Sequence, residues 1–221
     1  MSTRMAGATG TRRAGDRVLN RRDNGSMLQA VAVPKRTAFL TKEKERLLEI
    51  IREKSLLAGQ FKLASGSVTD YYLDMKPTTF DPEGATLLAE IIYDLLKDDL
   101  DVTSIGGLEL GAVPIIAAVC ARSSHDRPLS GFVVRKEKKG HGTDKKIDGN
   151  FKPNTTVVLI DDVTTKGGSV LQAVYAVRAR GATVKKIITA VDRLEGAKEN
   201  LLKEGIALLP IFTTRDFSVR R

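Results

Sequence analysis

The sequence has little cysteine and no long hydrophobic segment. Its one cysteine, Cys120, excludes an internal disulfide, and the apolar run around it is typical of a core thiol in a reducing compartment. The longest apolar run, residues 112–121, is about half of the roughly 20 residues that span a bilayer. The phosphate-loop pattern GxxxxGK[ST] and the dinucleotide pattern GxGxxG are also missing. We therefore expect a cytoplasmic protein without a membrane partner, and not one of the usual nucleotide-binding folds.

Positive charge is concentrated near the N-terminus. The 221 residues carry a net charge of +9, and residues 1–36 contribute eight Lys or Arg against two acids. This leaves the rest of the chain with a surplus of only three positive charges. Because that part is only mildly basic, we expect no nucleic-acid partner.

Composition divides the chain into two regions. Residues 1–36 are rich in Arg, Gly, Ser and Thr and show little apolar periodicity, which predicts a mostly disordered basic extension. Organelle targeting by this extension and a true start at Met27 both remain open, whereas a secretory signal would need an apolar core. Residues 37–221 are long enough for one folded domain with a substantial core.

The folded region begins with a helix and a hairpin. Apolar spacing predicts a helix within residues 41–57, capped by Thr41. Alternating apolar and polar residues predict a β-hairpin over 61–75. A second helix is expected at 81–97, because Asp81 is a good N-cap and proline follows it.

The rest of the chain alternates between strands and helices. The predicted strands are 102–108, 129–136, 155–162, 183–192 and 206–214, and the predicted helices are 112–123, 168–181 and 196–205. Nearly continuous apolar strands indicate a sheet covered on both faces. The alternation therefore predicts an α/β fold with a doubly wound, mostly parallel sheet.

The string VVLIDDVTTKGGS, residues 157–169, is the strongest functional signal. Asp161 and Asp162 end an apolar strand, and ligands of parallel sheets bind at such ends. The following glycines and helix start favour an anion, because backbone amides there can approach it closely. Carboxylates repel phosphate, so the acids should face sugar hydroxyls, a metal ion or a developing cation. A phosphorylated sugar offers all of these, although a plain capping turn is the alternative.

The string RKEKKGHGTDKKIDG, residues 135–149, is the second signal. It holds six Lys or Arg, three acids and three glycines, which predicts a mobile loop. One of the two histidines, His141, lies between two of the glycines. Beside a phosphate site this loop could close over a pyrophosphate, while a solvated run of charges is the alternative.

These strings resemble known enzymes. Residues 157–169 resemble the phosphoribosyl-pyrophosphate (PRPP) signature of type I phosphoribosyltransferases, and RKEKKGHG resembles the R-K-x-x-K-x-H-G loop of orotate phosphoribosyltransferases. Three further strings fit the same family: FKLASGSVTDYYLD its base-covering hairpin, GGLELGAVPIIA its pyrophosphate loop, and AVDRLEGA its orotate-binding arginine. The resemblance covers about residues 40–215. Some relatives carry lysine where this chain has Ala64 and Gly111.

The resemblance implies a complete reaction. It implies the type I fold over residues 37–221, with a helix and hairpin hood at about 40–80. It also implies transfer of phosphoribosyl from PRPP to orotate, with Mg²⁺ carried by PRPP and no direct metal ligands, in a homodimer with shared active sites. The implied catalytic residues are Asp161, Asp162, Lys139 and His141. The implied PRPP-binding residues are Arg135, Lys136, Lys139, His141, Asp161, Asp162, Val163, Thr164, Thr165, Lys166, Gly167, Gly168 and Ser169. Orotate would contact Thr165 and Arg193.

Two rival functions share part of this pattern. A phosphoribosyltransferase for a purine base would have residues 157–169 but would lack RKEKKGHG and the surroundings of Arg193. A PRPP-sensing regulator would need a DNA-binding module of roughly 60 to 70 residues, and the basic extension is too short for one. Too few residues remain for a fused decarboxylase barrel. Whether a separate decarboxylase binds stays open.

Overall fold

The structure is a computed structural model that describes residues 35–62, 68–137 and 146–217, with the backbone alone for 35–40 and 62. The expected basic extension therefore lies almost wholly outside the described residues. So does the central part of the basic loop, residues 138–145.

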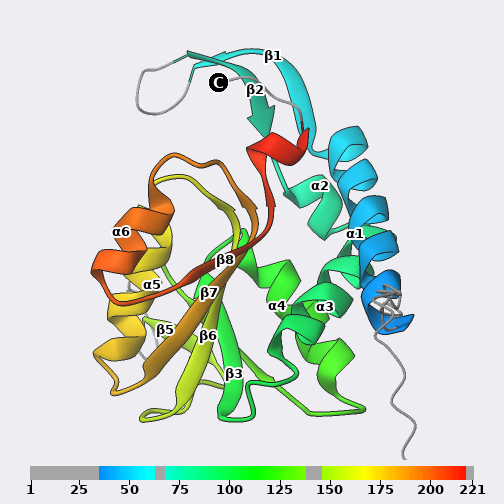
Figure 1. The fold of residues 1–221 in the computed structure, drawn as a ribbon. Helices are drawn as coiled ribbons and strands as arrows, with labels where there is room; N and C mark the ends of the chain where they lie inside the picture. Colours follow the sequence, from blue (N-terminus) through cyan, green and yellow to red (C-terminus); the bar gives the residue numbers. More distant parts are fainter. Residues whose placement is uncertain (1–34, 63–67, 138–145, 218–221) are drawn as a thin grey trace, which may run out of the picture. The chain divides into compact units, whose positions relative to one another are not determined.

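A six-stranded sheet forms the centre of the fold, in the order β5-β4-β3-β6-β7-β8 (Figure 1). Its strands are β3 (Val102–Leu108), β4 (Ser130–Val134), β5 (Ile147–Gly149), β6 (Thr156–Thr164), β7 (Thr183–Asp192) and β8 (Leu208–Thr213). All neighbours pair in parallel except β4 and β5. The expected mostly parallel sheet is confirmed. The edge strand β5 was not predicted, because three residues are too few to show a period.

Helices cover both faces of this sheet, as expected. Helices α3 (Pro82–Leu96) and α4 (Ala112–Ser123) lie on one side, and α5 (Gly168–Arg178) and α6 (Ala197–Lys203) on the other (Figure 1). Successive residues of a strand point to opposite faces. Accordingly, Val158 and Ile160 belong to the core beneath α3 and α4. Val157 and Leu159 belong to the core beneath α5 and α6.

The order of the strands reverses between β3 and β6. After β3 the chain adds β4 on one side, and it later returns to place β6 on the other side of β3. Such a switch point opens a crevice at the carboxyl ends of the two strands. Strand β6 runs to Thr164, two residues beyond the expected end, so both acids lie inside the strand near its carboxyl end.

The N-terminal elements differ in detail from the prediction. Helix α1 (Lys35–Lys54) begins six residues before Thr41, which therefore lies inside the helix and is not its N-cap. The intervening KRTAFL segment has no Gly or Pro that would stop a helix. The hairpin is confirmed as β1 (Leu56–Lys62) and β2 (Val68–Leu73), which pair antiparallel. A short helix, α2 (Lys76–Thr79), was not predicted.

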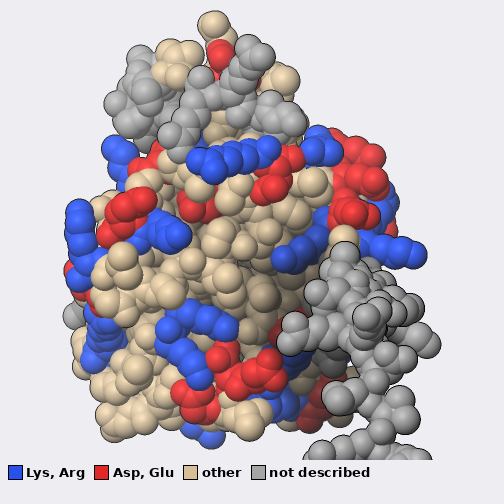
Figure 2. Space-filling model, viewed as in Figure 1, with Lys and Arg blue, Asp and Glu red and all other residues tan. Residues whose placement is uncertain are grey.

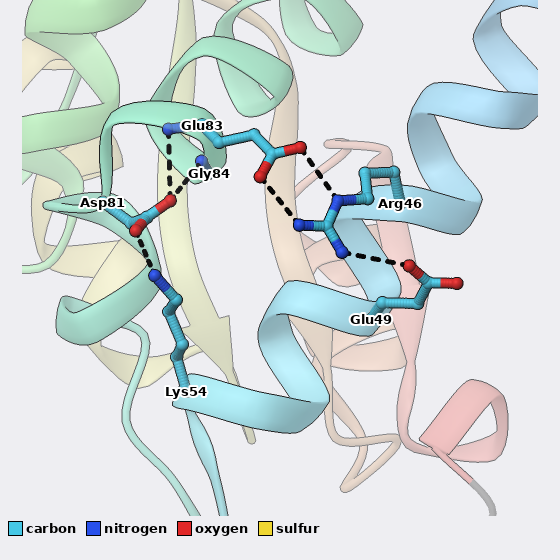
Figure 3. A network of polar contacts seen from close by, with 6 residues as sticks. All are labelled: Arg46, Glu49, Lys54, Asp81, Glu83 and Gly84. Atoms are coloured by element: carbon cyan, nitrogen blue, oxygen red, sulfur yellow. Dashed lines mark hydrogen bonds and ion pairs between the residues drawn. The ribbon is translucent and has the colours of Figure 1, made fainter.

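Polar contacts join α1 to the start of α3 (Figure 3). The Arg46 guanidinium donates to both carboxylate oxygens of Glu83 at 2.8 Å each, and to Glu49. Asp81 accepts the amides of Glu83 and Gly84 as the predicted N-cap and also pairs with Lys54. Exposed ion pairs contribute only about 0–1 kcal/mol each, so they orient α1 while buried apolar side chains stabilise it.

Charges of both signs mix on the surface. On the face shown in Figure 2, Lys and Arg lie among Asp and Glu around an uncharged central area. The basic residues of this face are therefore not gathered into a single patch. Among the helices that the structure describes, none is long and apolar enough to cross a membrane.

Candidate active site

A pocket of about 320 Å³ opens at the switch point. Its lining comes from α2, the loop after β3, the segment after β4, the end of β6 and the start of α5. Among the residues expected to bind PRPP, the pocket brings together Lys136, Asp161, Asp162, Val163 and Ser169. It also includes Lys76 and Glu109, which sequence reasoning missed.

Asp161 is a buried carboxyl group with an altered acidity. Its side chain accepts a hydrogen bond of 2.8 Å from the Thr164 hydroxyl, which lies 3.0 Å from the Thr189 hydroxyl. Burial raises the pKa of Asp161 to about 7, and the charge of Asp162 adds to this rise. The Thr164 hydrogen bond opposes it. Burial thus keeps the protonated form of Asp161 favoured to a higher pH than is usual for an aspartate.

Asp162 lies against the loop that follows β3. Its carboxylate accepts the Val163 amide at 2.9 Å. Burial raises its pKa, whereas the Val163 amide and the charge of Lys76 oppose the rise. A Cβ atom on Gly111 would lie 2.3 Å from this carboxylate. Only glycine permits that approach, so the acid lies directly against the backbone of the loop.

The segment 164–169 turns from β6 into α5. Gly167 adopts φ 82°, a left-handed conformation that suits glycine, at the N-cap of α5. Thr165, Lys166, Gly168 and Ser169 are exposed, whereas Thr164 and Gly167 are buried. The first residues of this eleven-residue helix are therefore accessible, and the start of a helix binds phosphate in other proteins.

Acidic side chains form hydrogen bonds and ion pairs with the first residues of the basic segment, Arg135 and Lys136. Arg135 donates to Asp148 at 2.5 Å and lies 3.8 Å from a carboxylate oxygen of Glu109. The amide of Lys136 donates to Glu109 at 2.9 Å. Lys136 lines the pocket, and Arg135 is not among its lining residues. Glu109 directly follows β3, and that position at the end of a strand beside β6 is the signal that could have identified it.

Two expected residues of the basic segment, Lys139 and His141, lie outside the described residues. Their roles therefore stay predictions.

Arg193 lies beneath the hairpin, beside the end of β6. It is 8% exposed, its Nε is 2.9 Å from a carboxylate oxygen of Glu195, and its guanidinium carbon is 5.0 Å from the Tyr71 ring centre. Its amide donates to the Thr164 carbonyl at 2.9 Å. Arg193 is near the acids through this backbone contact but is not among the lining residues of the pocket.

The arrangement combines opposite charges over a short distance. Carboxylates at the end of β6 can hold sugar hydroxyls and favour a developing positive charge. The start of α5 and the lysines of the pocket can hold anionic groups. The site therefore suits a sugar that carries phosphate on one side and loses an anion on the other.

The chain is similar to known proteins across this site. Residues 80–206 match the family model of the phosphoribosyl transferase domain. An orotate phosphoribosyltransferase of Bradyrhizobium sp. (strain ORS 278) is 45% identical over 177 residues, which cover 78% of this chain and 95% of the relative.

Solved structures agree with this match. The orotate phosphoribosyltransferase of Mycobacterium tuberculosis H37Rv in complex with Fe(III) dicitrate has a TM-score of 0.72 at 33% identity. Its complex with PRPP has a TM-score of 0.68 at 30% identity. Each covers 80% of this chain and 99% of the solved chain. The family match includes the ends of β3, β4 and β6 that form the pocket.

Proposed function

The chain belongs to the family of orotate phosphoribosyltransferases, which have the type I phosphoribosyltransferase fold, and from this premise we propose that it transfers phosphoribosyl from PRPP to a ring nitrogen of orotate. The products are orotidine 5′-monophosphate and pyrophosphate. The observation that carries the proposal is the pair Asp161 and Asp162 in a pocket at the switch point, directly followed by a phosphate-type loop.

The reaction needs a cation-like sugar to be stabilised. As the bond from C1 to the diphosphate breaks, positive charge develops on the ribose, and groups aimed at that charge lower the barrier. Asp162 and the ionised form of Asp161 supply negative potential there and hold the ribose hydroxyls. Residues 164–169 hold the 5′-phosphate through backbone amides and the start of α5.

The leaving diphosphate needs positive charge. Lys136 lines the pocket, and we assign the same task to Lys139, His141 and Arg135. No residue of this chain is assigned as a direct ligand of Mg²⁺, which would be carried by PRPP and would supply positive charge to the leaving group. His141 serves as a proton or hydrogen-bond donor to that group.

Orotate is recognised through its carboxylate. The planar guanidinium of Arg193 suits a carboxylate because it offers parallel donors, and Thr165 is the second proposed contact. Among hydrogen bonds and ion pairs in the described residues, the Arg193 side chain has one partner, Glu195, at its Nε. Orotate is already acidic at its ring, so no strong general base is assigned.

We propose a cytoplasmic homodimer in which the basic segment of one subunit completes the site of its partner. Mixing a Lys139→Ala protein with an Arg193→Ala protein tests this arrangement, because mixed dimers would contain one intact site. Partial recovery of activity is expected. No recovery would mean that each subunit forms its own complete site.

The direct test of function is consumption of orotate with PRPP and Mg²⁺, with adenine and hypoxanthine as competing bases. We expect turnover with orotate and negligible turnover with the purines. Turnover of a purine alone would establish the rival transferase. Binding to DNA that weakens with added salt, without any turnover of a base, would favour the PRPP-sensing regulator.

A further inference from the structure

Lys76 is a cation of the pocket that the reaction above does not use. It is the first residue of α2, 85 residues before Asp161 in the chain, yet both side chains line the same pocket. Helix α2 is reached directly from β2 and precedes α3 (Figure 1). Lys76 therefore lines the pocket from an element outside the central sheet.

The ammonium group of Lys76 has one hydrogen-bonded neighbour among the described residues. Lys76 Nζ donates to a carboxylate oxygen of Asp74 at 2.6 Å, and the same oxygen accepts the Lys76 amide at 3.1 Å. The side chain remains 53% exposed. An ammonium group has three donors, and among the described residues Asp74 takes one of them, so donors remain for a ligand.

The acidic side chains of the pocket lining outnumber the basic ones. Among its described lining residues, the cations are Lys76 and Lys136, against the acids Glu109, Asp161 and Asp162. A bound diphosphate would add further negative charge, and buried or partly buried anions need cationic partners.

The loop after β3 contributes no cation to the described lining of the pocket. It contributes Glu109, Leu110 and Gly111, and a side chain on Gly111 would begin 2.3 Å from the Asp162 carboxylate. Any residue other than glycine would displace that acid. Lys76 of α2, the element before α3, is therefore one of the two cations in the described lining, together with Lys136.

We propose that the ammonium group of Lys76 contacts the diphosphate of PRPP and remains with it as pyrophosphate leaves, which makes Lys76 a further catalytic residue. The proposal rests on the proposed function for the identity of the ligand. A second effect accompanies it: the charge of Lys76 opposes the rise in the pKa of Asp162 that burial causes.

Binding measurements on Lys76→Ala test the proposal. Calorimetry would compare magnesium pyrophosphate, Mg·PRPP and ribose 5-phosphate, which has no diphosphate. We expect affinity for the first two to fall about tenfold, as for loss of one charged hydrogen bond, and affinity for ribose 5-phosphate to change less than about twofold. Lys76→Arg should recover part of the loss.

The matched control is Lys97→Ala. Lys97 also pairs with a nearby aspartate, Asp94 at 3.2 Å, but lies outside the pocket lining. We expect all three affinities to stay near wild type in this variant. Thermal melting of each variant would show that the fold is retained.

The results separate this proposal from the proposed function. Unchanged pyrophosphate affinity in Lys76→Ala would overturn it, as would an equal loss for ribose 5-phosphate or absence of pyrophosphate binding by wild type. None of these measurements needs a base. If wild type did not consume orotate, the proposed function would fail, while a selective pyrophosphate loss in Lys76→Ala would still support the contact.

Discussion

The two walls of the pocket are built in different ways. One wall is a continuous piece of chain, from Asp161 through the loop to Ser169 at the start of α5. The other wall is assembled from three separate segments, represented by Lys76, Gly111 and Lys136. The continuous wall is recognisable as a sequence motif, and the assembled wall is not. Under the proposed function, binding of the 5′-phosphate would thus be encoded locally, whereas departure of the diphosphate would depend on how remote elements meet.

The largest effect is expected from Asp162→Asn in the continuous wall. The amide keeps the shape but removes the negative charge beside the ribose, so kcat should fall on the order of 100-fold or more. Asp126→Asn is the control, because Asp126 is exposed and pairs only with Arg122 among the described residues. Near-normal turnover of Asp162→Asn would remove the acid from the mechanism.

A pair of glycine substitutions compares the two walls directly. In Gly111→Ala the new Cβ would lie 2.3 Å from the Asp162 carboxylate, whereas in Gly168→Ala it would meet nothing within 4 Å. We expect Gly111→Ala to lower kcat/KM for PRPP by about tenfold, and Gly168→Ala to have a clearly smaller effect. Equal losses of kcat/KM in the two variants would mean that the lack of space for a side chain at position 111 does not explain the effect.

The pH dependence of activity reports on Asp161. Its pKa is raised from 3.8 to about 7, so the protonated form, which lacks the useful charge, dominates below that value. We expect kcat/KM for PRPP to rise with pH and level off above about 7. Asp161→Asn should remove this rise of kcat/KM with pH. A wild-type profile that is flat from about pH 5.5 to 8 would contradict the assignment.

The same group affects folding stability with the opposite trend. Between about pH 4 and 7 the folded protein keeps a proton that the unfolded chain has released. The contribution of Asp161 to stability therefore decreases as pH rises through this window. Chemical denaturation at pH 5 and pH 8 would show a smaller difference for Asp161→Asn than for wild type.

The smallest effect is expected from deletion of residues 1–34. Helix α1 begins at Lys35, so this deletion leaves every described residue in place. Activity of the purified protein should stay within about twofold of wild type. A large loss would mean that the basic extension takes part in catalysis.

Much of the fold was predictable because its signals are local. The boundaries of β3, α4 and β7 match the prediction, since apolar runs there end at clear glycine or polar breaks. Asp81 caps α3 as its sequence context suggests. The start of α1 and the existence of α2 and β5 were not predicted, because short or weakly patterned segments depend on what they contact.

The sequence by itself determined the family, the alternation of strands and helices, and the string that carries the acids and the phosphate-type loop, because these depend on residues close together in the chain. Only the tertiary structure decided that Lys76 and Glu109 join Asp161 and Asp162, and that Gly111 must be small. Those facts depend on which strand ends and helices meet at the switch point, and that meeting is set by packing between segments that are far apart in the chain.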